Sequence, residues 1–584
     1  MLAAGVPPED VIRAVLSSWM EIAAPQITQA DAIPELKANA SVIRFADWLL
    51  QGDVITGAFW LSSAYTSLIG PAHRKANAMY FTPPFLTSRL LDNVQKRGDM
   101  LVSGKLIDPA CGGGAFLAPA AQRIAQELRA RRLSADAILR HIESNLYGCD
   151  TSEFLCFLSE SFLRMVLAEL IEEAGRSPRF NIVTGDGLTQ FDEQRGEFSL
   201  VLCNPPYRKM TQAELAPYVT AHKTVLNGQP NLYSLFMHRA TQLLRPTGVA
   251  ALVTPMSYLS GRSFLGLRSV LMAQGEVQQL DLIHEKCGIF LLAEQDTVLT
   301  VWTKGTGTGQ PTEAYYLTPD GGCEIAGSLT LGVTTGPWPV PRCGADAELL
   351  PLFSAPPASL ATYAYRPKTG AIVVHRDPRQ RYKTEEAGTN AAALVPLIWS
   401  KNISPEGQLN TDRVARNCTA KYVDLGSLDS PCVIKRPAVV LQRVSTDSQP
   451  RRLVCAPVPD ELMERFGGVT GENHVGFLEQ IDPGSSATPE LLALILGTKT
   501  IDRLFRCISG ATNVSAYELL HLPLPDIDVV QGGLASGFSA DEAVRIGFGL
   551  SVIKPFSSQC SKPQDGQFSL VQHASHEPMA AGLI

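Results

Sequence analysis

The sequence predicts an α/β protein in which a doubly wound, Rossmann-like sheet of seven strands precedes a separate α+β domain. Between residues 106 and 304, short apolar runs alternate with longer stretches that have the apolar spacing of helices. Buried strands that alternate with helices are typical of a mostly parallel sheet covered on both faces. The seven expected strands are 106–108, 145–150, 180–186, 198–207, 248–255, 277–283 and 297–302.

The regions around this sheet have different compositions. Residues 1–75 have apolar residues at mixed three and four spacing, which predicts a helical region before the 76–305 domain. Residues 306–345 are rich in Gly, Thr and Pro and are expected to be a linker. Residues 346–525 combine short strand-like runs with one strong helix, and form the expected α+β domain. The Gly-, Ser- and Gln-rich residues 526–584 are expected to be a flexible tail.

Composition excludes several classes of protein. The chain has 584 residues, 45% hydrophobic and 18% charged, which indicates a globular protein of two or three domains. No apolar run is long enough to span a membrane and no signal-peptide pattern begins the chain, so we expect a cytoplasmic protein. A net charge of −7 disfavours a broadly basic nucleic-acid binder, although a local basic cleft is compatible with it.

The 12 cysteines predict neither a metal centre nor a disulfide framework. They are scattered singly, without CxxC pairs or zinc-ligand spacing. Cys111, Cys149 and Cys203 lie in or beside apolar runs and are expected to be buried, reduced thiols. We therefore expect no metal.

A glycine-rich turn follows the first expected strand. Asp108, Pro109, Ala110 and Cys111 lead into Gly112–Gly114, which opens a helix. Glycines allow a tight turn and a close approach of the backbone to a ligand, and ligands of doubly wound sheets bind at this end of the strands. The turn lacks the Lys-Ser/Thr of a P-loop, which disfavours a nucleoside triphosphate. Alone, it is equally compatible with a purely structural turn.

Acidic residues end the next two strands. Asp150 could accept both hydroxyls of a ribose, and a helix N-cap is the alternative role. Asp186 could accept a hydrogen bond from an adenine amine, although alone it is more often a turn residue.

The fourth strand ends in Asn204-Pro205-Pro206-Tyr207. Two prolines cannot continue a central strand, so they stiffen a loop and leave carbonyl groups free. The side-chain oxygen of Asn204 and the carbonyl of Pro205 could accept both protons of one amine, which directs its lone pair toward an electrophile. Tyr207 could offer a flat face to a nucleobase, a contact of about 1–3 kcal/mol.

With these motifs in this order, the sequence resembles the gamma-class amino-methyltransferases of restriction-modification type, which methylate N6 of adenine in DNA. The similarity runs from about residue 80 to 302, and more loosely beyond. Tyr80-Phe81-Thr82-Pro83 looks like the motif that folds over the cofactor, and Asn231-Leu232-Tyr233 and the strand ending at Pro255 fit later motifs. Phe290 lies where the family carries an aromatic residue that holds the extruded base. The doubled Pro83-Pro84 and the long gap before Asp150 depart from the family pattern.

The resemblance implies a Rossmann-like methyltransferase sheet at 76–305, S-adenosylmethionine as cofactor, and a direct displacement without metal or covalent enzyme intermediate. It implies a role for each matching residue. Those expected to contact the cofactor are Tyr80, Thr82, Pro83, Asp108, Ala110, Gly112, Asp150 and Asp186; those expected to act on the base are Asn204, Pro205, Pro206, Tyr207 and Phe290.

The C-terminal half resembles the target-recognition regions that follow such catalytic domains. Arg443, Arg451 and Arg452 are candidates for contacts with DNA phosphates or guanine edges. A second basic cluster surrounds Tyr382 and comprises Arg376, Arg379, Arg381 and Lys383. A solvated loop face is the alternative for any single arginine, and Asn473 and His474 are more typical of a turn.

The same motifs also occur outside methyltransferases of double-stranded DNA. The same loop serves methyltransferases of RNA and of protein glutamine, but these resemble shorter chains without a large C-terminal region. A silent DNA-binding subunit is disfavoured by the intact set of acids and Asn204. A fused nuclease is disfavoured because no PD…ExK spacing precedes residue 80. A separately encoded restriction endonuclease stays open as a partner.

Overall fold

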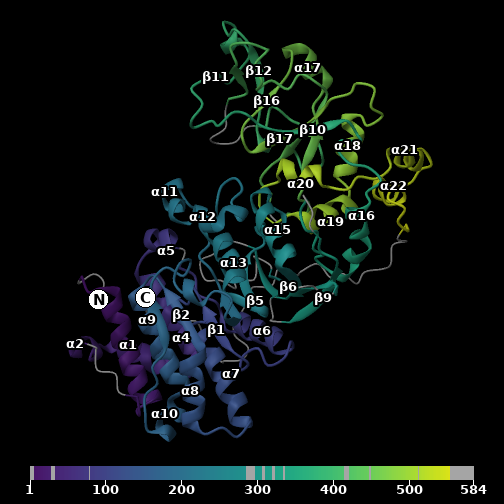
Figure 1. The fold of residues 1–584 in the computed structure, drawn as a ribbon. Coiled ribbons are helices and arrows are strands. Elements are labelled where there is room, and N and C mark those ends of the chain that lie inside the picture. Colours follow the sequence, from purple (N-terminus) through teal and green to yellow (C-terminus); the bar gives the residue numbers. More distant parts are fainter. Residues whose placement is uncertain are drawn as a thin grey trace.

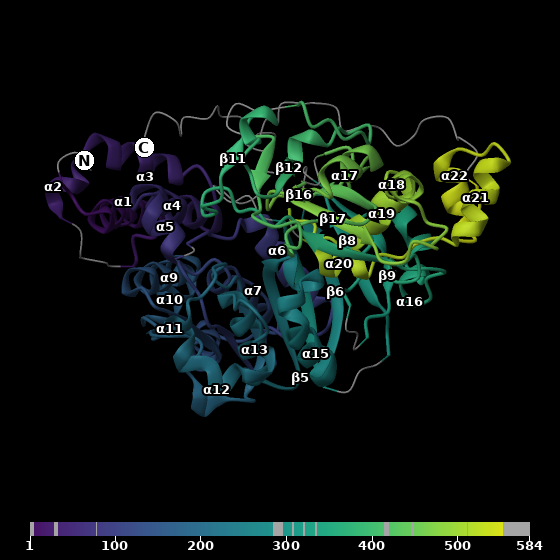
Figure 2. The same ribbon diagram turned by 90° about the horizontal axis from the view of Figure 1, so that it is seen from above.

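A computed structural model gives the fold of the chain, and it describes residues 5–27, 33–77, 79–283, 296–305, 309–318, 322–332, 336–413, 420–445, 449–510 and 512–552. A large central sheet carries helices on both faces (Figure 1). The N-terminal helices lie at one end of this sheet and the C-terminal part at the other, in both views (Figures 1 and 2).

The central sheet has nine strands in the order β3-β2-β1-β4-β5-β7-β6-β8-β9. The first five strands of the chain are parallel where they pair, whereas β7 runs antiparallel to both β5 and β6. The strands are β1 Lys105–Asp108, β2 Leu146–Asp150, β3 Asn181–Thr184, β4 Phe198–Cys203, β5 Leu244–Pro255, β6 Gly275–Ile283, β7 Thr297–Lys304, β8 Thr312–Leu317 and β9 Cys323–Leu329.

The α/β prediction is confirmed, and the seven expected runs correspond to β1–β7. The number of strands was wrong, because the segment 306–345 is not a linker throughout. Strand β8 pairs with β6 in parallel and β9 with β8 in antiparallel fashion, so both extend the sheet. Their inward positions, among them Ala314, Leu317 and Ala326, are buried, but small and polar residues between them obscure the apolar pattern.

Two layers of helices bury the two faces of the sheet. In β4, Leu200 and Leu202 belong to one apolar core and Val201 and Cys203 to the other, as the alternation of a strand requires. The first core is covered by α6 Pro84–Gln95, α7 Leu117–Ala130, α8 Ala135–Asn145, α9 Glu153–Val166 and α10 Ala168–Ala174. The second is covered by α13 Leu232–Leu243, α14 Ser257–Ser260 and α15 Leu265–Gln274.

Local sequence explains where several of these helices begin. The side chains of Ser134, Ser152 and Asn231 accept hydrogen bonds from backbone N–H groups in the first turns of α8, α9 and α13. Pro84 occupies the first position of α6, where a missing N–H costs nothing. Helices α8 and α9 therefore start at fixed points on either side of β2, which positions Asp150.

The N-terminal helices pack directly on the sheet domain. They are α1 Pro8–Ala23, α2 Pro34–Lys37, α3 Ala40–Leu49, α4 Val54–Leu68 and α5 Pro71–Asn77. Trp19 of α1 is buried against Phe162 of α9, with ring centroids 6.3 Å apart. Helix α4 shares the same core and reaches the glycine turn.

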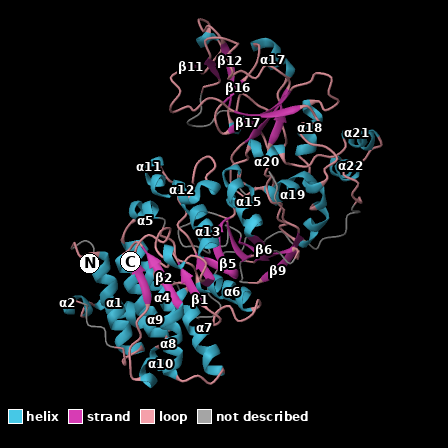
Figure 3. Ribbon diagram, viewed as in Figure 1, coloured by secondary structure: helices cyan, strands magenta, loops and turns pink. Residues whose placement is uncertain are grey.

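The C-terminal part is an α+β unit with two four-stranded sheets (Figure 3). Its strands are β10 Tyr365–Thr369, β11 Arg381–Tyr382, β12 Leu394–Ile398, β13 Tyr422–Asp424, β14 Ala438–Gln442, β15 Cys455–Pro457, β16 Thr470–Gly471 and β17 Val475–Gln480. Its helices are α16 Pro351–Ser354, α17 Asp460–Phe466, α18 Pro489–Leu496, α19 Lys499–Ile508, α20 Ala516–Leu520, α21 Ile527–Ala535 and α22 Ala540–Gly547.

The predicted flexible tail is partly wrong. Helices α21 and α22 lie within it, and Val530, Val544 and Phe548 are buried in the core of the C-terminal part. Asp526 and Ser539 cap the two helices. Residues 553–584 lie outside the described residues.

Two arginines, the buried Arg268 and the partly buried Arg342, join the sheet domain to the C-terminal part. The guanidinium of Arg268, in α15, donates to the carbonyls of Tyr258, Gly261 and Gly336 and to the hydroxyl of Tyr517. Arg342 donates to the carbonyls of Arg506 and Ser509 at the end of α19. Hydrogen bonds from these two guanidinium groups therefore fix the interface between the sheet domain and the C-terminal part.

Candidate active site

A cavity of about 560 Å³ opens at the carboxyl ends of β1–β4. It collects residues that are far apart in the sequence: the glycine turn, the acids after β2 and β3, and the loop after β4. Of the predicted site residues, those that line it are Tyr80, Thr82, Asp108, Ala110, Gly112, Asp150, Asp186, Asn204 and Pro206. Pro83, Pro205 and Tyr207 are not among its lining residues, and Phe290 lies outside the described residues.

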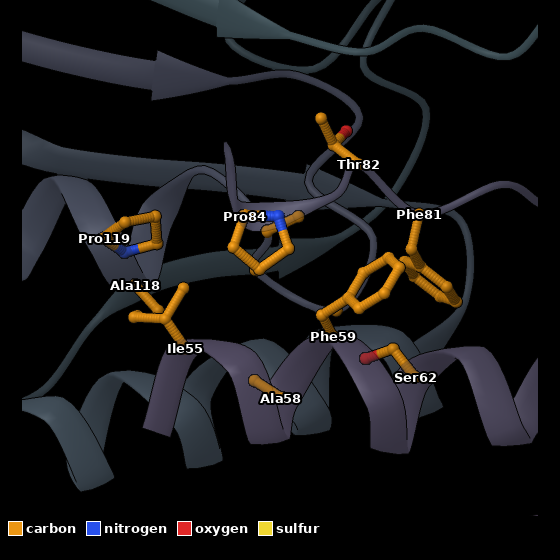
Figure 4. A pocket seen from close by; sticks show the side chains of 12 residues that line it. Ile55, Ala58, Phe59, Ser62, Phe81, Thr82, Pro84, Ala118 and Pro119 are labelled. Carbon is orange, nitrogen blue, oxygen red and sulfur yellow. The ribbon is translucent and has the colours of Figure 1, made fainter. Parts of the chain in front are cut away.

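Close packing against two helices favours glycines in the turn. A Cβ atom at Gly113 would lie 2.8 Å from Ser62 Oγ of α4, and one at Gly114 would lie 2.8 Å from Ser159 Oγ of α9. Gly112 and Gly114 also adopt positive φ angles of 51° and 76°. A small second pocket marks this contact, where Ser62 lies below Phe81 (Figure 4). The N-terminal helices thus support the turn, a role that the sequence did not indicate.

Asp108 is a buried carboxyl group at the end of β1, only 1% exposed. Its Oδ1 accepts a hydrogen bond from the backbone N–H of Ala110 at 3.0 Å. The pKa of Asp108 is raised to about 8: burial is the main cause, the nearby Asp150 adds to it, and the bond from Ala110 opposes it. The site therefore favours a cation beside Asp108, because a positive ligand would stabilise the ionised carboxylate.

Asp150 ties the end of β2 to the glycine turn. One carboxylate oxygen accepts from the N–H of Gly112 at 3.0 Å and the other from the N–H of Ser152 at 2.9 Å. Burial nevertheless raises the pKa of Asp150. Because each carboxylate oxygen has a second lone pair, Asp150 can still accept hydroxyl groups from a ligand.

Asp186 is bonded on both oxygens as well. Oδ1 accepts from the N–H of Leu188 at 3.0 Å, and Oδ2 accepts from the hydroxyl of Tyr218 at 2.7 Å. Burial, together with this bond, raises the pKa of Tyr218 to about 12. Tyr218 lines the cavity, but it lies 32 positions from Asp186 and no local motif indicated it.

The side chain of Asn204 is bonded at both ends. Its Nδ2 donates to Thr82 Oγ1 at 2.9 Å and to the carbonyl of Tyr80 at 3.5 Å, and its Oδ1 accepts from the hydroxyl of Tyr207 at 2.6 Å. The tyrosine hydroxyl also lies 2.9 Å from the carbonyl of Val253.

Tyr207 is half-buried and packs edge-on against Tyr233, with centroids 6.1 Å apart. Its hydroxyl points into the protein, which gives it a contact with Asn204 that the sequence did not predict. Stacking of a base on its ring stays a prediction.

One of the three predicted DNA-contacting arginines was wrong. Arg452 is 1% exposed, donates to Ser509 Oγ at 2.8 Å and lies over the ring of Phe505. It stabilises the C-terminal core and is not accessible to DNA. Arg451 is exposed, whereas Arg443 is half-buried and donates to the carbonyl of Asn473 at 2.7 Å.

In the second basic cluster, Arg376 and Lys383 are exposed. Arg381 donates to the carbonyl of Val374 at 2.7 Å, and Arg379 lies 3.6 Å from Asp377. Two of the four cations are thus partly engaged within the protein. Cys111, Cys149 and Cys203 are buried free thiols, as predicted.

The fold and the site together define a class: a doubly wound domain with a cavity at its strand ends that collects three aspartates beside an Asn-Pro-Pro-Tyr loop. A comparison with protein families makes this more specific. Residues 144–290, which include Asp150, Asp186 and Asn204, match the model of the Eco57I restriction-modification methylase family. This part of the sheet domain is therefore similar to methyltransferases of the restriction-modification type.

Curated relatives are consistent with this class. The chain is 24% identical over 226 residues to the Type II methyltransferase M.BstVI of Geobacillus stearothermophilus, a match that covers 37% of this chain and 39% of the relative. It is 20% identical over 463 residues to the Type II methyltransferase M.BsuBI of Bacillus subtilis, covering 74% and 84%. The chain thus spans less than half the length of M.BstVI but most of M.BsuBI.

A solved structure shares the fold over nearly the whole chain. The Type IIL restriction-modification enzyme MmeI, solved in complex with DNA, aligns with a TM-score of 0.54 and 12% identity. The alignment covers 94% of this chain and 88% of MmeI. The likeness extends over the C-terminal part, so MmeI shares the overall fold of this chain.

Proposed function

We propose that this chain transfers a methyl group from S-adenosylmethionine to N6 of adenine in double-stranded DNA, as the modification enzyme of a restriction-modification system. The observation that carries this proposal is that Asn204 shares one cavity with Asp108, Asp150 and Asp186. The acidic residues could bind the methyl donor, and Asn204 could accept a hydrogen bond from the acceptor amine. Both substrates of a methyl transfer would therefore find binding groups in the same cavity.

The residues present fit S-adenosylmethionine. The buried carboxyl of Asp108 suits a cationic methionine portion, because burial disfavours its charged form and a cation beside it would stabilise that form. Asp150 has lone pairs for the ribose hydroxyls, and Asp186 for the adenine amine.

When bound, the cofactor supplies a methyl group on a sulfonium centre. The chain itself positions the acceptor. Asn204 Oδ1 and the carbonyl of Pro205 accept the two protons of the adenine amine, which directs the nitrogen lone pair away from the ring and toward the cavity. The adenine must first leave the duplex, which costs a few kcal/mol. Positioning and preorganised acceptors supply the catalysis.

DNA is the proposed partner. MmeI, which has the same fold, was solved with DNA, and this chain carries exposed basic residues in the corresponding C-terminal part, among them Arg376, Lys383 and Arg451. A separately encoded endonuclease would complete the system. None of the helices in the described part of the chain is long and apolar enough to cross a membrane.

Methyl transfer from labelled cofactor to unmodified DNA tests the proposal. We expect label in N6-methyladenine, and loss of labelling in Asn204→Ala. Asn39→Ala is a matched control. Asn39 does not line the cavity, and its side chain accepts a hydrogen bond from the backbone N–H of Ser41 at the start of α3. If RNA or a protein glutamine is labelled and DNA is not, the proposed substrate is wrong. If the chain binds DNA but labels nothing, it is a silent DNA-binding subunit.

A further inference from the structure

The orientation of the Asn204 amide is set by its neighbours. The carbonyl of Tyr80 can only accept a hydrogen bond, and it faces the same end of the amide as Thr82 Oγ1. A carbonyl acceptor there favours the NH2 group at that end. The opposite end, Oδ1, accepts from Tyr207. The Tyr80 contact is long, at 3.5 Å, so the 2.9 Å bond to Thr82 is the stronger one that holds the NH2 group.

This orientation matters for the reaction proposed above, on which the inference rests. A target amine has protons to donate, so it needs an acceptor. If the amide turned over, its NH2 group would face the amine, donor against donor. We infer that Thr82 is a positioning residue whose hydroxyl oxygen holds the Asn204 amide with Oδ1 available to the target base.

Thr82 is well placed for this role because its own position is rigid. Its side chain is 3% exposed. It directly precedes Pro83, the N-cap of α6, and Pro84, so two fixed φ angles follow it. Figure 4 shows its side chain pointing away from α4, while Phe59 and Ser62 lie on the other side of the loop. The hydroxyl therefore cannot easily follow Asn204 if the amide rotates.

The inference assigns Thr82 a task different from direct binding of the cofactor. A ligand of the cofactor would change cofactor affinity, whereas a residue that orients Asn204 changes the rate of methyl transfer after both substrates are bound. The two roles are separable by measuring the dissociation constant and the single-turnover rate constant for the same variants.

The variants are Thr82→Val, which keeps the shape and removes the acceptor, and Thr82→Ser, which keeps the acceptor. Thr241→Val is the matched control, because Thr241 is also buried but its hydroxyl donates only to the backbone carbonyl of His238 in α13. Single-turnover methylation of DNA is measured at saturating S-adenosylmethionine, and binding of S-adenosylhomocysteine by calorimetry.

We expect Thr82→Val to lower the single-turnover rate about tenfold, the effect of one neutral hydrogen bond, with cofactor affinity within threefold of wild type. Thr82→Ser should restore the rate to within threefold, and Thr241→Val should keep it. An unchanged rate in Thr82→Val, an equal loss in Thr82→Ser, or a parallel loss of cofactor affinity would each overturn the inference. If the valine variant does not fold, Thr82→Ala takes its place under the same criteria. An inactive wild type would instead contradict the proposed function.

Discussion

The buried carboxyl of Asp108 predicts that the cofactor-free protein is destabilised by its own active site. The perturbation is Asp108→Asn, which keeps the size of the side chain and an oxygen for the N–H of Ala110 but cannot ionise. Because the pKa of Asp108 rises from 3.8 to about 8 on folding, the folded state retains a proton that the unfolded state releases between these two values. Stability therefore falls as pH rises through this window, and the variant lacks that fall.

The magnitude follows from the width of the window. One pKa unit corresponds to 1.36 kcal/mol, so at pH 7 the ionisable carboxyl costs at most about 4 kcal/mol relative to a neutral side chain of the same shape. Below pH 4 the cost vanishes, since both states are protonated, and above pH 8 it is constant. Asp108→Asn should therefore be the more stable protein, by a margin that grows from pH 5 to pH 8 and then stops growing.

Thermal unfolding of cofactor-free protein at pH 5, 6, 7 and 8.5 measures this margin. The exposed Asp482→Asn serves as the control and should show no pH-dependent gain. A stability difference between Asp108→Asn and wild type that is the same at every pH, or that shrinks as pH rises, would refute the reasoning. The same variant should lose binding of S-adenosylmethionine, which separates stability from function.

Three further outcomes are expected. Because the cationic cofactor would ionise Asp108, cofactor binding should release close to one proton at pH 7, and cofactor affinity should rise with pH up to about 8. Calorimetry in buffers of different ionisation enthalpy measures the proton release and the affinity. If no proton is released, Asp108 is not the group that binds the cation. A Cβ at Gly187 would lie 1.8 Å from the carbonyl oxygen of Pro109. Gly187→Ala should therefore abolish cofactor binding or lower the melting temperature by several degrees. Unchanged cofactor affinity and melting temperature would show that the backbone relaxes freely around this contact. Arg451→Ala should weaken DNA binding with the melting temperature unchanged, whereas Arg452→Ala should lower the melting temperature; gel-shift and melting assays that gave the reverse pattern would exchange the two assignments.

The parts of the fold that the sequence predicted are those governed by local rules. Strands β1–β7 contain short apolar runs, so their place in the chain could be predicted. The glycine turn, Asp150, Asp186 and Asn204 follow such strands directly. Since parallel strands end at one edge of a sheet, their meeting in one cavity was predictable.

The parts that were missed depend on contacts distant in sequence. Strands β8 and β9 are recognisable only because β6 offers them an edge. Arg451 and Arg452 are adjacent and chemically identical, and only the packing of Phe505 and Ser509 buries the second. Tyr218 reaches Asp186 across a segment of short helices that has no apolar periodicity. In each case, tertiary packing determines the structure of a residue or strand whose local sequence is compatible with more than one conformation or environment.

The bonds of Arg268 and Arg342 have a consequence for how the proposed enzyme would choose its base. Both guanidinium groups clamp the end of the sheet domain to the helices that carry the C-terminal sheets. If those sheets recognise a short DNA sequence, the fixed connection between the two parts also fixes the number of base pairs between that sequence and the modified adenine. Substitutions on the C-terminal surface could then alter which bases are recognised, while the position of the methyl mark relative to them stays the same.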